Sequence, residues 1–243
     1  MIFDAKTVKE NLVLWIRDCF EQNGSSCKAV LGISGGKDST VAAALCAEAL
    51  GKQRVVGVMM PNGIQPDIAD SRAVCAHLGI EAYEVNIKES YEAVLAQLSD
   101  KLPVSEQTRI NLAPRIRMSA LYAVSQSVNG RVINTSNKSE TWIGYSTRYG
   151  DGVGDFAPLI NLTASEVVAV GQELDIPSYL VLKSPADGLT GKTDEDKLGF
   201  TYAALDRYIR TGKIENLDWK EKIDTLHKIN AFKRKDMPSF PYN

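Results

Sequence analysis

The most constraining feature of this sequence is the stretch 30–40, Val-Leu-Gly-Ile-Ser-Gly-Gly-Lys-Asp-Ser-Thr. It begins as an apolar run typical of a buried strand, turns at Gly35 and Gly36, and continues over 39–50 as a strong helix former. The free N–H groups at the start of such a helix, together with its dipole, attract anions. Two glycines also let the backbone come close to the bound group, because no Cβ stands in the way. We therefore predict a strand–loop–helix unit that binds phosphate.

The residues of the loop restrict which phosphate-binding motif it is. A Walker A loop requires Ser or Thr after its lysine, but Lys37 is followed by Asp38, and the G-x-G-x-x-G fingerprint is absent. An acidic side chain in a phosphate loop would repel the ligand unless a cation lay between them, so Asp38 implies Mg²⁺. An ordinary strand-to-helix turn is the alternative, and the ordered set Ser-Gly-Gly-x-Asp-Ser argues against it.

Composition excludes several other classes of protein. With 243 residues the chain is long enough for one large α/β domain or two small ones, and its net charge of −2 gives no case for nucleic acid as a partner. The four cysteines form no C-x-x-C pair and the two histidines are isolated, so we expect reduced thiols in a cytoplasmic protein and no zinc cluster. No apolar stretch is long enough to predict a membrane span, and the first residues do not read as a signal peptide.

Strand-like and helix-like segments alternate along the chain, which predicts an α/β fold: a doubly wound, mostly parallel sheet with helices on both faces. We expect one domain over 1–243, a helix over 105–127 that is interrupted or kinked at Pro114, a glycine-rich functional loop over 144–158 and a lid over 184–196. The other expected strands and helices are strands at 54–60, 81–86 and 130–134, and helices at 4–22, 67–77, 90–98, 163–174, 198–209 and 218–230.

The loop motif resembles the pyrophosphate loop of the ATP pyrophosphatases, and the whole chain is similar to one family within them, the ammonia-dependent NAD⁺ synthetases. That resemblance implies a Rossmann-like fold of the adenine nucleotide alpha hydrolase type. The matching segments follow in the same order over nearly the whole chain: Gly32 to Ser39, Arg115-x-Arg117, Thr135 with Glu140, Tyr149-Gly-Asp-Gly, Lys183-x-Pro185, Thr193-Asp-Glu, Gly199-x-Thr201-Tyr202 and the basic C-terminal segment.

The resemblance implies a ligase that converts deamido-NAD⁺, ATP and ammonia to NAD⁺, AMP and pyrophosphate, the final step of NAD⁺ biosynthesis. A carboxylate cannot be amidated directly, because its leaving group would be oxide. Adenylation makes AMP the leaving group, and the charge that builds on the phosphate oxygens requires Mg²⁺ and fixed donors. The chain shows no glutamine-hydrolysing region, so free ammonia is the expected nitrogen source. The family also implies a homodimer, for which the apolar helical stretch 112–128 is a candidate interface or a buried core helix.

By matching position, the resemblance also implies the roles of individual residues. Asp38 and Glu140 would bind Mg²⁺. Asp151 and Ser34 are the expected catalytic residues. Asp151 would orient ammonium or accept its proton. Deamido-NAD⁺ would contact Arg115, Arg148, Asp155, Phe232 and Lys233. ATP would contact Gly32, Ile33, Ser34, Gly35, Gly36, Lys37, Asp38, Ser39, Thr135, Lys183 and Thr201.

Three positions depart from the family pattern. Arg148 stands where lysine is common, Phe232 replaces the usual histidine of a His-Lys pair, and Met59 occupies a position that often carries arginine near the adenine. The alternatives are another ATP pyrophosphatase, such as a tRNA-modifying adenylating enzyme, and a nucleotide-binding sensor. A tRNA-modifying enzyme commonly carries a basic surface or paired cysteines, and a sensor would leave Glu140, Asp151 and Lys183 without a role.

Overall fold

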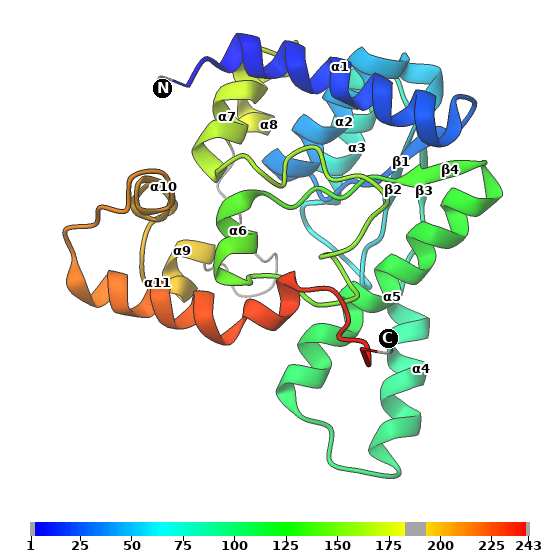
Figure 1. The fold of residues 1–243 in the computed structure, drawn as a ribbon. Coiled ribbons are helices and arrows are strands. Elements are labelled where there is room, and N and C mark those ends of the chain that lie inside the picture. Colours follow the sequence, from blue (N-terminus) through cyan, green and yellow to red (C-terminus); the bar gives the residue numbers. More distant parts are fainter. Residues whose placement is uncertain (1–2, 183–192, 242–243) are drawn as a thin grey trace.

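The computed structural model describes residues 3–182 and 193–241, and Figure 1 shows a parallel sheet between layers of helices. The strands are β1 (Lys28–Gly32), β2 (Val55–Met59), β3 (Glu81–Glu84) and β4 (Gly130–Val132). The helices are α1 (Ala5–Gly24), α2 (Lys37–Leu50), α3 (Ile68–Leu78), α4 (Lys88–Ser99), α5 (Glu106–Ser127), α6 (Lys138–Ile143), α7 (Ala164–Gln172), α8 (Ser178–Val181), α9 (Asp194–Leu198), α10 (Tyr202–Thr211) and α11 (Leu217–Ile229), with short 3-10 turns at Lys52–Arg54 and Ala231–Arg234.

The strands lie in the order β3-β2-β1-β4, and every pair is parallel. Val30 in the central strand pairs with Val56 on one side and with Val132 on the other. The chain therefore moves outward from β1 through β2 to β3 and then returns to the opposite side of β1 for β4. Ligands of open α/β sheets bind outside the carboxyl ends of the strands at such a reversal, here between β1 and β4.

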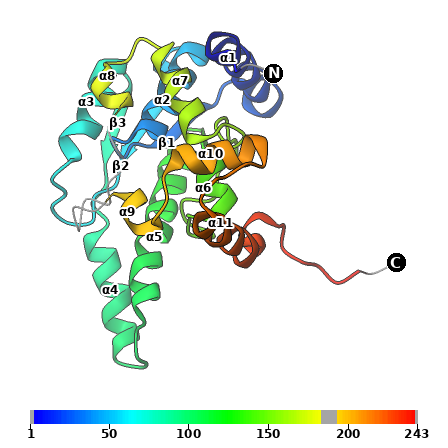
Figure 2. The same cartoon turned by 90° about the vertical axis from the view of Figure 1, so that its left-hand side faces the viewer.

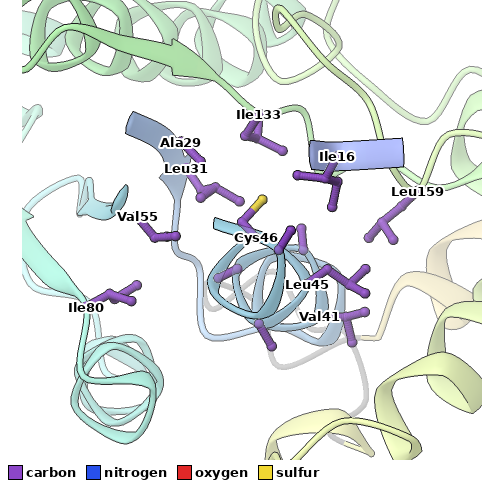
Figure 3. Packing of buried hydrophobic residues seen from close by; sticks show 14 of the residues in the cluster. Ile16, Ala29, Leu31, Val41, Leu45, Cys46, Val55, Ile80, Ile133 and Leu159 are labelled. Carbon is purple, nitrogen blue, oxygen red and sulfur yellow. The ribbon is translucent and has the colours of Figure 1, made fainter. Parts of the chain in front are cut away.

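Alternate residues of the buried strands feed two different cores. Ala29 and Leu31 face the layer of α1, α2, α3 and α7, in which α2 is almost completely surrounded (Figure 3). Val30 and Val132 face α5 on the other side of the sheet, where they meet Leu121. Burial on both faces explains why β1 and β2 read as continuous apolar runs, and it confirms the predicted α/β fold with helices on both sides of the sheet.

A third apolar cluster lies beside the sheet and joins the last helices of the chain. Ile143 of α6, Leu198 of α9, Leu205 of α10 and Ile223 of α11 form its buried centre. In Figure 1 these helices form a separate group next to the ends of the strands. This cluster fixes the position of α6 and α10 relative to the phosphate loop.

The α4–α5 pair projects away from the sheet, as Figure 2 shows. Ser105 begins α5, since its Oγ accepts a hydrogen bond from Thr108 N at 3.1 Å. The helix then continues to Ser127 with Pro114 inside it, so the predicted interruption is absent. The stretch 112–128 is core in part, because Leu121 packs on the sheet together with Val124 and Val128. None of the described helices is both long and apolar enough to cross a membrane.

Two boundaries in the last third of the chain differ from the sequence prediction. The helix predicted over 198–209 is two helices, because Gly199 ends α9 in a left-handed conformation and Thr201 caps the start of α10. The predicted lid over 184–196 lies largely outside the described residues, and its last residues are the N-terminus of α9.

Candidate active site

The predicted phosphate loop connects β1 to α2 and closes on itself through hydrogen bonds. Gly36 N donates to Ser34 Oγ at 3.2 Å, and Ser39 Oγ donates to the Gly36 carbonyl at 3.1 Å. Gly35 takes φ = +78°, which favours glycine, and a Cβ there would lie 2.9 Å from the Cβ of Asp70. Gly36 is the N-cap of α2 and has no side chain to cap the helix. The first N–H groups of α2 therefore stay available to an anionic ligand.

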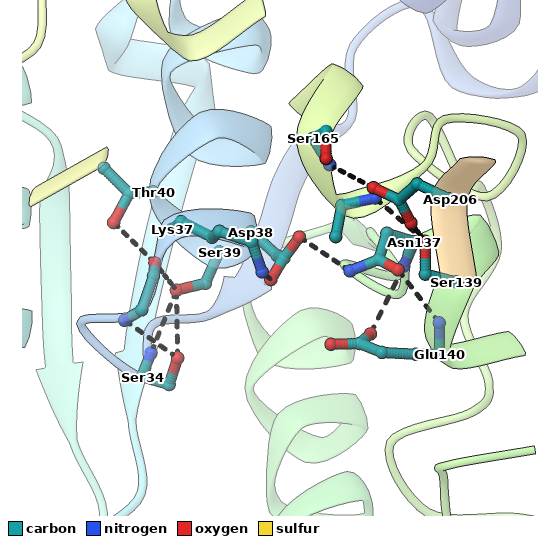
Figure 4. A network of polar contacts seen from close by, with 12 residues as sticks. Ser34, Lys37, Asp38, Ser39, Thr40, Asn137, Ser139, Glu140, Ser165 and Asp206 are labelled. Carbon is teal, nitrogen blue, oxygen red and sulfur yellow. Dashed lines mark hydrogen bonds and ion pairs between the residues drawn. The ribbon is translucent and has the colours of Figure 1, made fainter. Parts of the chain in front are cut away.

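A polar network joins this loop to the end of β4 (Figure 4). Asp38 accepts a hydrogen bond from Asn137 Nδ2 at 3.0 Å and pairs with Lys37 Nζ at 2.7 Å. Asn137 is fully buried and is the N-cap of α6 in a capping box with Glu140. One side chain thus ties Asp38 to the helix that carries Glu140, across the reversal in strand order.

The electrostatics of this cluster are compatible with the predicted cation. Burial and the nearby Asp38 raise the pKa of Glu140 to about 8, against a smaller lowering effect of Lys37. Burial alone lowers the pKa of Lys37, but Asp38 and Glu140 outweigh burial and hold it above its usual value. Ionised Glu140 beside Asp38 would place two negative charges next to one ammonium ion, and a bound metal ion would favour that ionised form.

Asp38 and Glu140 fit a magnesium ion better than a zinc ion. Mg²⁺ binds hard oxygen ligands and commonly takes one or two carboxylates together with substrate phosphates and water. Among the described residues no group of three or more His, Cys, Asp or Glu side chains is arranged to hold a metal by itself. The two carboxylates beside a phosphate loop match that partial ligand set.

Buried hydrogen bonds support the cluster from behind. Ser139 Oγ bonds to Asp206 Oδ1 of α10, and it accepts from Ala164 N of α7 at 2.9 Å. The other carboxylate oxygen of Asp206 accepts from Ser165 N at 2.8 Å. These contacts lock α6, α7 and α10 together, so Asn137 and Glu140 sit on a fixed frame.

The second part of the site is the glycine-rich loop after α6. Asn134, at the end of β4, donates through Nδ2 to the carbonyls of Asp151 and Val153, at 2.9 and 3.0 Å. On the other side, Gly150 lies so close to α5 that a Cβ on it would be 2.9 Å from the Pro114 Cβ. The loop is therefore held between the carboxyl end of the sheet and α5.

Asp151 is oriented by this loop. Its Oδ1 accepts a hydrogen bond from Thr147 N at 2.6 Å. The residue is exposed, but loop atoms crowd its carboxyl group, and this desolvation raises the pKa of Asp151 against the opposing effects of the Thr147 N–H, Lys233 and Arg117. A carboxylate with a raised pKa is the stronger proton acceptor near neutral pH.

Four residues predicted to contact deamido-NAD⁺ meet around the same loop. Arg115 Nε donates to the Arg148 carbonyl at 3.3 Å, and the Arg148 guanidinium lies 5.0 Å from the Tyr149 ring centroid and 5.7 Å from that of Phe232. Lys233 Nζ donates to the carbonyls of Gly144 and Ser146, at 2.7 and 2.8 Å. In place of a hydrogen-bonding histidine, Phe232 gives Arg148 an aromatic face.

Other predicted residues have structural partners in the ligand-free chain. Asp155 accepts from Val132 N at 2.7 Å and from Tyr122 at 3.3 Å, so both carboxylate oxygens are engaged. Thr201 caps α10, Thr135 lies half-buried just after β4, and Met59 is buried in the main core. Lys183 lies outside the described residues. Their contacts with ATP or deamido-NAD⁺ stay predictions.

Sequence reasoning missed Asn137 and Asn134. The spacing Asn137-x-x-Glu140 was a readable capping-box signal for α6. Asn134 had no comparable signal, because its partners are loop carbonyls that only the folded chain brings near.

Comparison with known proteins agrees with this geometry. A family model described as NAD synthase matches residues 8–237. The chain belongs to the NAD synthase family. It is 38% identical to the NH₃-dependent NAD⁺ synthetase of Finegoldia magna over 237 residues, which cover 96% of this chain and 95% of that relative.

Two solved structures of the family cover nearly the entire chain. The NMN synthetase of Francisella tularensis superposes with a TM-score of 0.91 at 34% identity and covers 99% of this chain and 100% of that one. The NH₃-dependent NAD synthetase of Campylobacter jejuni, in complex with nitrate, gives 0.80 at 31% identity with the same coverage. The fold predicted from the sequence is thus the fold of this NAD synthase.

Proposed function

We propose that this NAD synthase amidates deamido-NAD⁺ with ammonia at the expense of ATP, through an acyl-adenylate. The observation that carries the proposal is the link from Asp38 through Asn137 to Glu140, because it brings two carboxyl groups together beside the phosphate loop, as the proposed Mg²⁺ requires. Relatives named as NH₃-dependent NAD⁺ synthetases at 38 and 39% identity support the same activity.

In the first half-reaction the nicotinate carboxylate attacks the α-phosphorus of ATP. A P–O bond forms to the carboxylate oxygen, the bond to the β-phosphate oxygen breaks, and pyrophosphate leaves. The N–H groups at the start of α2 and the ammonium of Lys37 hold the phosphate oxygens in place. Asp38 and Glu140 would hold Mg²⁺, which when bound neutralises the charge on those oxygens.

In the second half-reaction ammonia attacks the acyl carbon and AMP departs with the bridging oxygen. We propose that Asp151 accepts the proton that the nitrogen must lose. The pKa of Asp151 is raised, and the Thr147 N–H fixes the orientation of its carboxyl group. Arg115, Arg148 and Lys233 line the same loop and provide the positive charge that a dinucleotide pyrophosphate requires.

The test is pyrophosphate release from Mg·ATP, measured with and without deamido-NAD⁺, followed by addition of ammonium. Release that depends on deamido-NAD⁺, with NAD⁺ formed after ammonium, is the expected result. Binding of ATP without any turnover would instead indicate a nucleotide sensor.

A second candidate activity is amidation of nicotinate mononucleotide. The observation that favours it is the TM-score of 0.91 to an NMN synthetase, against 0.80 to an NAD synthetase of equal coverage. The chemistry is the same, and the substrates differ only in the adenylate half. The ratio of kcat/KM for the two substrates separates them, and we expect it to favour the dinucleotide.

We further propose that the chain forms a homodimer through α4 and the first half of α5. Only Leu121 and Ser125 of α5 are fully buried in the single chain, while Val94, Leu102 and Ile110 are exposed on the projecting pair. Light scattering of Ile110→Asp tests this proposal, and a smaller mass than the parent protein is expected. The four free cysteines support a cytoplasmic location, where thiols stay reduced.

A further inference from the structure

The hydroxyl group of Tyr202 is an unexplained polar group beside the phosphate loop. Tyr202 is the first residue of α10, only 7% of its surface is exposed, and its ring packs with Leu198 and Leu205 in the third apolar cluster. The hydroxyl is buried and has no hydrogen-bond partner among the described residues. A buried donor without an acceptor destabilises a fold, so a native protein that keeps one requires an explanation.

The surroundings of Tyr202 are those of the cation site. Lys37 Nζ lies 5.7 Å from the centroid of its ring, within the range of a cation–π contact. Burial raises the pKa of Tyr202, and the carboxylates of Glu140, Asp194 and Asp38 raise it further. The phenol therefore keeps its proton at neutral pH and is a hydrogen-bond donor to any acceptor that a ligand brings.

The position of this donor is fixed before any ligand binds. Tyr202 N donates to Glu195 Oε1 at 2.7 Å, and Thr201 caps the same turn through Ala204 N. Asp206, one turn further along α10, is bonded to Ser139 in the helix of Glu140. A donor held by two helices loses little conformational entropy when it binds.

We propose that the Tyr202 hydroxyl donates a hydrogen bond to a phosphate oxygen of ATP bound at the loop 34–39, and so acts as a positioning residue for adenylation. The proposal rests on the proposed function, because it requires ATP phosphates at that loop. Lys37 contacts both Asp38 and the Tyr202 ring. If Asp38 held a divalent cation, its pairing with Lys37 would weaken, and the ammonium would be free to bind phosphate beside the fixed phenol.

Tyr202→Phe removes only the hydroxyl, and Tyr208→Phe on the same helix is its matched control. Tyr208 donates to Asp224 at 2.8 Å on the side of α10 toward α11. We expect Tyr202→Phe to weaken Mg·ATP binding about tenfold in calorimetry and to leave Tm unchanged or higher, because it removes an unpaired donor. Tyr208→Phe should lower Tm and leave the Kd of Mg·ATP unchanged.

Each result decides the matter. Equal Mg·ATP affinity for Tyr202→Phe and the parent protein overturns the proposal, and so does weaker binding accompanied by a Tm loss like that of Tyr208→Phe, since the hydroxyl would then be structural. In single-turnover pyrophosphate release, the ATP concentration at half-maximal rate should rise while the saturated rate stays within a few fold. If the parent protein binds no Mg·ATP, the proposed function itself is refuted. That outcome differs from equal binding by the parent protein and Tyr202→Phe, which refutes only the role of the hydroxyl.

Discussion

The two halves of the site are built in different ways. The half that we propose binds ATP (the ATP half) is a run of neighbouring residues, 34–40, closed by its own hydrogen bonds. The half that we propose binds deamido-NAD⁺ (the substrate half) combines α5, the loop 144–155 and the segment Phe232–Lys235, which meet mainly through side chains that donate to backbone carbonyls. Local geometry fixes the first half, whereas the second depends on tertiary packing. In the proposed reaction, adenylation depends on the locally fixed half, whereas the ammonia step at Asp151 and substrate choice depend on the half that tertiary packing assembles.

The largest effect is expected at the cation site. Asp38→Asn removes a negative charge beside the phosphates, so we expect the rate of pyrophosphate release to fall about 10³-fold. Glu48→Gln is the control, since Glu48 lies on the same helix and pairs with Lys9 on the surface. A rate for Asp38→Asn within tenfold of the parent protein would contradict the assignment of Asp38 to the metal.

Asp151→Asn should separate the two half-reactions. It keeps the hydrogen bond from Thr147 N but removes the proton acceptor, so amide formation should fall about 10²-fold while adenylation continues. Rapid-quench chromatography should then show acyl-adenylate accumulating before NAD⁺. Equal losses in both steps would mean that Asp151 only supports the fold of its loop.

Gly35→Ala tests whether the ATP half is as rigid as its hydrogen bonds indicate. Gly212 has a similar φ, +69° against +78°, but nothing lies within 4 Å of a Cβ placed there. Both substitutions carry the strain of a left-handed alanine. Only Gly35→Ala adds contacts with Asp70 and Ser71, so it should lose about 2 kcal/mol more in the free energy of unfolding. Urea denaturation measures the difference, and equal losses would show that the loop adapts.

Lys233→Ala should change the substrate half alone. The variant loses the two bonds to the carbonyls of Gly144 and Ser146, so we expect KM for deamido-NAD⁺ to rise about tenfold with little change in KM for ATP. Lys235→Ala is the control, because only the carbonyl of Lys235 takes part in the contact with Arg148. An equal rise in KM for ATP would contradict the view that the ATP half and the substrate half are built independently.

The stability of the protein without ligands should also shift with pH. The pKa of Glu140 is about 8 in the folded chain and about 4.3 in an unfolded one. Between these values the folded chain keeps a proton that the unfolded chain has lost, so the free energy of unfolding falls as pH rises. Tm should drop by roughly ten degrees from pH 5 to pH 8. Glu140→Gln should flatten that slope, and an unchanged slope would contradict the raised pKa.

The sheet and long helices were predictable because their signals are local. Apolar runs mark β1 and β2, and a long periodic segment marks α5 even with Pro114 inside it. The short helices α6, α8 and α9 were missed. Helices of four to six residues are too short for a periodic pattern and are held by caps and packing rather than by propensity.

The candidate site shows the same difference between local and long-range signals. The function of Ser34 to Ser39 could be predicted because a single loop contains all the residues of the motif. The contact of Asn137 with Asp38, 99 residues earlier, depends on the strand order β2-β1-β4, which no local pattern contains. The same limit hid the unpaired hydroxyl of Tyr202, since burial is a property of the packed helices.

The placement of Phe232–Lys235 gives the chain a built-in order of completion during its synthesis. The phosphate loop, residues 34–39, comes before the loop 144–155 in the chain, and the segment Phe232–Lys235 that holds the second loop comes after both. A nascent chain would therefore contain the phosphate loop well before it contained the segment that we propose helps to bind deamido-NAD⁺. A chain truncated before Phe232 should therefore keep the fold of the phosphate loop and lose the contacts that hold the loop 144–155.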